Sequence, residues 1–258
     1  MQKWCAPCFS RGFPHEGQSA GIFQVAFGLL GAEGNVVLPA HEFPANVYPW
    51  MRAADVGGPE VRLVPCPDGR VTAERLAPAV DAATRAVAVS LVDFVTGFRV
   101  DLEELRAAFP GPLLVVDGIQ GLGAVAASLA PADVLVAGGQ KWMRAGWGSG
   151  VMAVGDRALE RLAPTLTGWT GVERFLDFTA PPPHPILDAA DRFQEGSPPF
   201  LGTLQLGAAA EVIEALAVGL ADFAQKEAFE TGAALTIVGA HLSEEPMRFS
   251  PAASAAIT

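Results

Sequence analysis

LVVDGIQGLGAVAASLAPADVLVAGGQKWMRAGWGSG, residues 114–150, is the stretch that decides the fold of this 258-residue chain. An apolar run at residues 113–116 ends on Asp117, and a second apolar run at 134–137 is followed by Gly-Gly-Gln and Lys141. Both runs are short, contain branched residues and are bounded by glycine, which predicts two buried parallel strands. Ligands of open α/β sheets bind outside the carboxyl ends of the strands. We therefore expect Asp117 and Lys141 to point into one site.

Lysine is rare in this chain and occurs only at positions 3, 141 and 226. A lysine among glycines and tryptophans at a strand end is costly to place unless its amine is used covalently or electrostatically. Pyridoxal phosphate needs a lysine amine for a Schiff base and an acid that keeps the pyridine nitrogen protonated. The alternative is that Asp117 caps a following helix and Lys141 is a solvated loop lysine. The complete pattern, in order, favours the cofactor.

The segment closely resembles the aminotransferase class V family, which includes cysteine desulfurases, selenocysteine lyases, kynureninases and isopenicillin N epimerase-like enzymes. The shared pattern is an apolar strand, Asp-x-x-Gln, and a second strand that ends in His-Lys or Gln-Lys before a glycine-rich turn. The resemblance implies the large domain of PLP-dependent transferase fold type I, with pyridoxal 5'-phosphate as cofactor. It assigns Asp117 to the pyridinium nitrogen, Gln120 to the phenolic oxygen of the cofactor, and Lys141 to the Schiff base.

The resemblance extends to further residues that would bind the cofactor. Relatives hold the phosphate with a pair of small hydroxyl residues at the start of this expected helix. Ser19 matches that pattern, while Gln18 replaces the first hydroxyl of the pair. An ordinary serine N-cap is the alternative. Phe43 matches the plate stacked on the pyridine ring, or else belongs to the core. Gln140 stands near the phosphate, and Ser197 matches a hydroxyl that reaches the phosphate of the neighbouring subunit.

Five positions in three segments depart from the family pattern. Desulfurases carry histidines where this chain has Phe43 and Pro44. Many relatives carry Ser and His where this chain has Gly138 and Gln140. An amide at position 140 can still donate a hydrogen bond, with less charge than an imidazolium. Asp93 also replaces an uncharged residue of the relatives.

The chain alternates helix and strand signals from about residue 19 to 155, which predicts βαβ units and a mostly parallel α/β sheet flanked by helices. A capping box at Asp101 opens one helix. We expect the other helices at 20–30, 45–54, 72–83, 118–127 and 204–220, and strands at 35–38, 61–64, 86–92, 113–116, 134–137 and 151–154. The expected domains are an N-terminal segment at 1–17, a PLP-binding large domain at 18–220 and a remnant of the small C-terminal domain at 221–258. Both ends are expected to be short of the family plan.

Composition excludes several classes of protein. A net charge of −11 argues against a nucleic-acid surface. No apolar stretch reaches the length of a membrane span, and the N-terminus lacks the apolar core of a secretory signal, so we expect a cytoplasmic protein. Cys5 and Cys8 form a C-x-x-C without the partners of a zinc site, and no metal is expected. No cysteine follows Cys66, which disfavours a desulfurase with a cysteine nucleophile.

The leading hypothesis is a homodimeric PLP-dependent enzyme that acts at the α-carbon of a small amino acid. Transamination, epimerisation and β-elimination all stay open. The rival hypothesis is a truncated, catalytically silent paralogue that keeps the fold as a binding or scaffolding protein. A nicotinamide-binding domain is disfavoured because no G-x-G-x-x-G follows the first strand.

Overall fold

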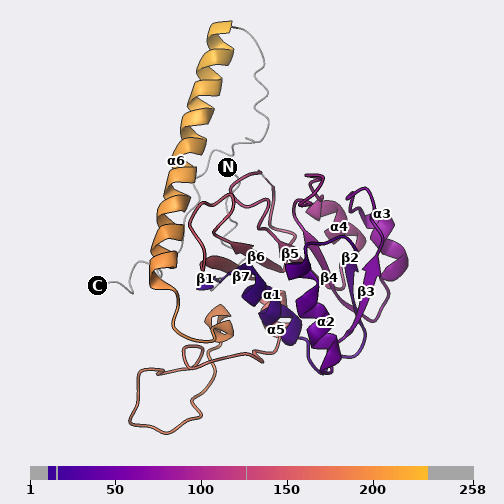
Figure 1. The fold of residues 1–258 in the computed structure, drawn as a ribbon, viewed down its shortest axis with the longest axis vertical. Coiled ribbons are helices and arrows are strands. Elements are labelled where there is room, and N and C mark those ends of the chain that lie inside the picture. Colours follow the sequence, from indigo (N-terminus) through magenta and orange to yellow (C-terminus); the bar gives the residue numbers. More distant parts are fainter. Residues whose placement is uncertain (1–10, 16, 126, 232–258) are drawn as a thin grey trace.

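The computed structural model of the chain describes residues 11–15, 17–125 and 127–231. Their strands form one seven-stranded sheet in the order β1-β7-β6-β5-β4-β2-β3 (Figure 1). Neighbouring strands are parallel from β3 to β6, while β7 is antiparallel to both of its neighbours. The strands are β1 (Arg11–His15), β2 (Asn35–Pro39), β3 (Glu60–Val64), β4 (Thr84–Ser90), β5 (Leu113–Asp117), β6 (Val134–Gly138) and β7 (Gly150–Val154). The expected mostly parallel sheet is confirmed.

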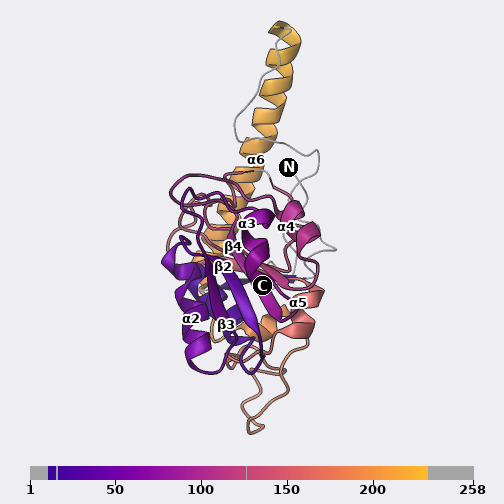
Figure 2. The ribbon, with the colours of Figure 1, turned by 90° about the vertical axis from the view of Figure 1, so that its right-hand side faces the viewer.

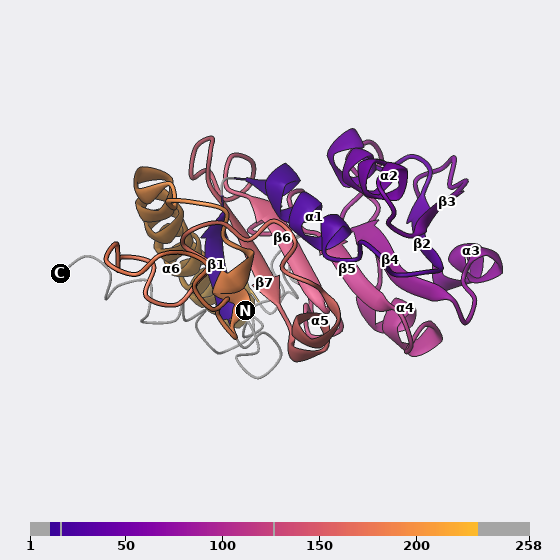
Figure 3. The same ribbon diagram turned by 90° about the horizontal axis from the view of Figure 1, so that it is seen from below.

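Helices cover both faces of the sheet, as Figure 3 shows for α1 and α2 on one side and α4 on the other. Alternate residues of each strand enter the two cores, because successive side chains of a strand point to opposite faces. One core joins the sheet to α1 (Gln18–Phe27), α2 (Tyr48–Asp55) and α5 (Asp156–Arg161). The second core joins it to α3 (Ala73–Leu76) and α4 (Leu102–Ala108). Leu113 and Val115 of β5 lie in the α1 core, so Asp117 follows them onto the same face.

The expected helix at 118–127 is wrong. The described residues 118–125 form successive turns, closed by hydrogen bonds such as Leu122 N–H to the Gly118 carbonyl at 2.7 Å. Glycine explains the difference, since Gly123 has a φ of 83° and a Cβ at Gly121 would lie 2.5 Å from the Leu91 side chain. A left-handed residue ends a helix, and glycine adopts that conformation without strain.

Several other boundaries also differ from the expected ones. The helix expected at 72–83 ends early, as α3 followed by the short 3-10 helix η2 (Ala77–Ala79), because Pro78 cannot continue a helix. The helix expected at 45–54 is divided into η1 (Pro44–Asn46) and α2. Strand β1 was not predicted from sequence. A further 3-10 helix is η3 (Ala190–Phe193).

A long helix, α6 (Phe200–Thr231), begins against the sheet and then runs beyond it (Figure 2). Its first turns carry Leu206 and Ala210 into a third apolar cluster with Met143 and Ala145. The same helix crosses residue 220, where a domain boundary was expected, and the expected division into domains stays a prediction. The expected N-terminal segment lies mostly outside the described residues. Among the described residues, no helix has both the length and the apolar character required to cross a membrane.

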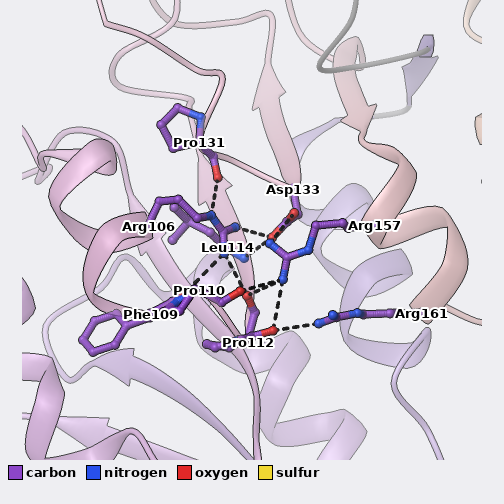
Figure 4. A network of polar contacts seen from close by, with 10 residues as sticks. Arg106, Phe109, Pro110, Pro112, Leu114, Pro131, Asp133, Arg157 and Arg161 are labelled. Atoms are coloured by element: carbon purple, nitrogen blue, oxygen red, sulfur yellow. Dashed lines mark hydrogen bonds and ion pairs between the residues drawn. The ribbon is translucent and has the colours of Figure 1, made fainter.

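The amino ends of β5 and β6 are tied together by Asp133 (Figure 4). Its carboxylate accepts from the Leu114 backbone N–H at 2.7 Å and pairs with Arg106, and a second arginine, Arg157, lies 3.4 Å away. The arginines also cap backbone carbonyls of the loop before β5, including a 2.7 Å bond from Arg161 to Gly111. The network lies at the amino ends of the strands, whereas Asp117 and Lys141 lie at the carboxyl ends. We therefore assign it a structural role.

Candidate active site

Asp117 and Lys141 lie at the carboxyl ends of two neighbouring parallel strands. Asp117 is the last residue of β5 and is the ladder partner of Val136 in β6. Strand β6 ends at Gly138, and Lys141 follows three residues later. The positive charge of Lys141 acts on the Asp117 carboxyl and favours its ionised form. Both residues therefore lie at the carboxyl end of the sheet, and their use in one site stays a prediction.

The Asp117 carboxyl is buried, with 1% of the residue exposed. Its Oδ1 accepts from the Ile119 backbone N–H at 3.0 Å, and its Oδ2 accepts from the Gln18 amide Nε2. Burial raises the pKa of Asp117 to about 7, mainly because the charged form loses its hydration. The Ile119 bond, Lys141 and the Gln18 bond oppose this rise in pKa, while the nearby charge of Glu42 adds to it.

Helix α1 reaches the carboxylate because it packs closely against the sheet. A Cβ at Gly21 would lie 2.5 Å from the Val136 side chain, so only glycine permits this approach without a shift of its neighbour. Gly17, with a φ of 140°, precedes the helix, and Gln18 is its first residue. The amino end of α1 is thereby directed at Asp117.

Phe43 lies beside the lysine. The Lys141 Nζ is 5.2 Å from the centroid of the Phe43 ring, within the range of a cation–π contact. Phe94 packs edge-on against the same ring, with 5.3 Å between centroids. Phe43 is 40% exposed, so it is not a core residue. An aromatic face is thus available next to the amine.

The loop that carries Phe43 is attached to the sheet by Glu42. The Glu42 carboxylate accepts from the Ser90 backbone N–H at 2.7 Å and also from the Ser90 hydroxyl. Burial raises the pKa of Glu42 above its ordinary value, and the two hydrogen bonds from Ser90 oppose that rise. Sequence reasoning missed this pair, although Glu42 directly precedes the expected plate Phe43 and Ser90 lies within the strand expected at 86–92.

Gln120 has its amide oriented by a tryptophan. The Trp142 indole Nε1 lies 3.2 Å from the Gln120 Oε1. An indole N–H can only donate, so the amide oxygen must face it and the amide NH₂ is left to donate elsewhere. Trp142 was not among the predicted site residues, although it immediately follows Lys141 in the sequence.

Gln140 folds back over the end of β6. A Cβ at Gly138 would overlap the Gln140 side-chain amide, so the missing side chain at position 138 makes room for it. Ser19 is exposed on the first turn of α1, and Ser197 is exposed in the loop before α6. The roles of Ser19, Gln140 and Ser197 toward a phosphate stay predictions.

The sequence matches the aminotransferase class-V family over residues 15–236. The chain belongs to this family. A probable cysteine desulfurase of Aeropyrum pernix is 28% identical to it, over 95% of this chain and 60% of that protein. A cysteine desulfurase of Salmonella newport is also 28% identical, over 72% of this chain and 46% of that protein. This class V chain thus spans about half of the length of the curated relatives it matches.

Solved structures of low sequence identity share the class V fold. The apo cysteine desulfurase of Thermococcus onnurineus NA1 superposes with a TM-score of 0.68 at 22% identity, over 85% of this chain and 57% of that one. A C-DES mutant with glycine covalently linked to its PLP cofactor gives a TM-score of 0.70 at 21% identity, over 80% of this chain and 57% of that one. The fold is therefore that of PLP-dependent fold type I enzymes.

The residues present fit pyridoxal 5'-phosphate, the cofactor of the class V family. The buried carboxylate of Asp117 suits a protonated ring nitrogen. The amine that the cofactor requires, that of Lys141, lies at the same carboxyl end of the sheet. The Phe43 face and the NH₂ of Gln120, whose amide oxygen is engaged by Trp142, add a stacking surface and a donor. Among the described residues, no group of three or more His, Cys, Asp or Glu side chains is placed to hold a metal ion.

Proposed function

We propose that this chain is a PLP-dependent enzyme that acts at the α-carbon of a small amino acid, with Lys141 as its catalytic residue. The convergence of the buried Asp117 carboxylate and the Lys141 amine at the ends of β5 and β6 carries the proposal. Membership of the class V family supports it. Transamination, epimerisation and β-elimination all begin with removal of the proton at the α-carbon.

The bound cofactor would supply an electron sink for the α-carbon. Asp117, which is itself buried, would hold the ring nitrogen in its protonated form by a charge-assisted hydrogen bond. Its Ile119 and Gln18 donors fix the plane of the carboxylate, so the carboxylate does not need to reorient when the ring binds.

Lys141 would carry the cofactor on its amine and then, once released, accept the proton of the substrate α-carbon. General bases of this kind must lie within hydrogen-bond reach of the proton that they abstract. Phe43, on which the amine lies, would form one wall of the ring site and keep water from that face. Gln120 would donate to the phenolic oxygen, because its amide oxygen is already engaged by Trp142.

The proposed assembly is a homodimer in which Ser197 reaches the phosphate of the partner's site. Ser197 is exposed, and it is followed by the exposed apolar residues Phe200 and Leu201. A symmetric dimer would bury these residues and complete two sites at once. Light scattering should show a dimer when the cofactor is bound and a shift toward monomer when it is removed. A cofactor-saturated monomer would contradict the shared site.

The decisive experiment locates the cofactor on the chain. Purified protein with pyridoxal 5'-phosphate should show a long-wavelength absorbance band that borohydride bleaches irreversibly. Digestion and mass spectrometry should then find the reduced pyridoxyl group on Lys141, and Lys141→Ala should abolish both the band and turnover. The group found only on Lys3 or Lys226 would refute the assignment.

A further inference from the structure

Each oxygen of the Asp117 carboxylate has its own donor in the folded chain. The Ile119 backbone N–H serves Oδ1, and the Gln18 amide serves Oδ2. A carboxylate oxygen has lone pairs for more than one donor, so Oδ2 can accept from a ring nitrogen as well as from Gln18. The two existing bonds therefore fix the carboxylate and still leave it able to bind a cation.

Gln18 is part of the helix–sheet packing rather than a surface side chain. It is the first residue of α1 and is 5% exposed. The helix cannot move away from the sheet without losing the close contact between Gly21 and Val136. In the described part of the chain, the amide of Gln18 is hydrogen-bonded to Asp117 and not to the other residues expected around a phosphate.

The charged groups that act on Asp117 come from two loops. Glu42, in the loop after β2, disfavours a second negative charge at Asp117, and Lys141, after β6, favours it. The proposed function commits the lysine amine to the cofactor and to the substrate proton. A neutral donor fixed on α1 stabilises the charged carboxylate independently of the state of that amine.

We propose that Gln18 is a positioning residue for Asp117, whose amide keeps the buried carboxylate ionised and correctly oriented for the ring nitrogen of the cofactor. The part that concerns the cofactor rests on the proposed function, whereas the coupling between Gln18 and Asp117 belongs to the chain itself. This role differs from the phosphate contact that the family resemblance suggested for position 18.

The coupling is tested in the cofactor-free protein by carbon-13 NMR titration of the Asp117 carboxyl, assigned with Asp117→Asn. Gln18→Met keeps the length of the side chain and removes the donor. It should raise the pKa of Asp117 by about one unit, because a hydrogen bond to the charged form favours that form. An unchanged pKa would overturn the proposal. If Gln18→Met fails to fold, Gln18→Asn, whose amide is too short to reach, replaces it.

A second glutamine of the same helix provides the matched control. Gln24 is also buried, and its Nε2 donates to the Glu195 carboxylate at 2.9 Å. Gln24→Met makes the same chemical change in α1 without touching Asp117. It should leave the pKa of Asp117 where it is in the unsubstituted protein. An equal rise in both variants would show a general loosening of α1 and would contradict a specific role of Gln18.

Cofactor affinity gives a second readout that a purely structural role would not move. At pH 7, a one-unit rise from a pKa of about 7 lowers the ionised fraction of Asp117 from about one half to about one tenth. Gln18→Met should therefore bind pyridoxal 5'-phosphate about fivefold more weakly. It should bind the 1-deaza analogue, which lacks the ring nitrogen, as well as the unsubstituted protein does.

The outcomes separate this inference from the proposed function. Equal weakening for both cofactors would overturn the positioning role and favour a phosphate contact or a structural effect. If the unsubstituted protein bound neither cofactor, the proposed function would fail, and with it the cofactor role of Gln18. The titration would still decide whether Gln18 controls the ionisation of Asp117.

Discussion

Ser90 and Asp117 are direct partners in the parallel ladder of β4 and β5. One residue anchors the loop of the aromatic plate through Glu42, and the other is the buried acid of the site. The position of Phe43 relative to Asp117 is consequently set through two adjacent strands rather than through a long loop.

Glu42→Ala should loosen this connection. It leaves the partly buried Ser90 N–H and hydroxyl without acceptors, and an unmet buried donor costs at most about 1–3 kcal/mol of unfolding free energy. We expect this loss in urea denaturation, together with weaker cofactor binding as the Phe43 ring loses its fixed place. Ser90→Ala removes only the hydroxyl bond and should show a smaller version of both effects. Full cofactor affinity in Glu42→Ala would contradict the anchoring role.

Asp117→Asn should change how stability depends on pH in the cofactor-free protein. The folded-state pKa of about 7 lies above the unfolded value near 3.8, so the folded state binds the extra proton between these values. The contribution of this residue to unfolding free energy is therefore full below pH 4 and is lost as the pH rises to 7, on the order of 4 kcal/mol. The Asn variant lacks this slope, so the stability difference between the two proteins should vary over this range. A constant difference would refute the raised pKa.

Trp142→Phe should release the Gln120 amide while keeping an aromatic ring. Without the indole donor, the amide can rotate and present its oxygen to the phenolic oxygen of the cofactor, which is repulsive. We expect about tenfold weaker cofactor binding and a shifted absorbance band, consistent with the loss of about one hydrogen bond to a charged oxygen. Trp147→Phe is the control, because Trp147 lies in the same loop and is 85% exposed. In titrations with the cofactor, Trp147→Phe should keep the affinity of the unsubstituted protein, whereas Trp142→Phe should bind more weakly.

Asp133→Ala should destabilise the fold without altering the site. It removes the carboxylate partner of Arg106 and the acceptor of the Leu114 N–H. Removal of one partner of a buried ion pair costs up to about 3–5 kcal/mol, and the bonds that Arg106 keeps to backbone carbonyls reduce that cost. The exposed pair of Arg52 and Asp55 is the comparison, and Asp55→Ala should cost less than about 1 kcal/mol. Thermal denaturation measures both. Cofactor affinity measured below the unfolding temperature should be the same in both variants.

The sequence carries the positions of the strands more clearly than those of the helices. Continuous apolar runs such as 113–116 mark buried strands whatever their neighbours are, and Asp117 and Lys141 follow from the ends of those runs. Residues 118–125 satisfied a helical pattern, yet the contact of Gly121 with Leu91 favours turns. That contact joins segments distant in the chain and is invisible to a local pattern.

The site residues also divide into those that the sequence could predict and those that it could not. Asp117, Gln120 and Lys141 are specified by a motif along the chain, and Phe43 was placed by its resemblance to a family segment. The bond from Gln18 to Asp117 and the bonds from Ser90 to Glu42 join residues 99 and 48 positions apart. Only the packing of α1 against the sheet and the pairing of β2 with β4 bring these residues together, so no spacing rule could have predicted them.

The Gly138 and Gln140 pair has a consequence for how such a chain can diverge. A side chain at position 138 would meet the terminal amide of Gln140, which lies at the free end of a flexible side chain and can turn aside. A substitution at 138 alone would therefore redirect that amide and leave the backbone of β6 in place. Such a change can alter the site without altering the fold.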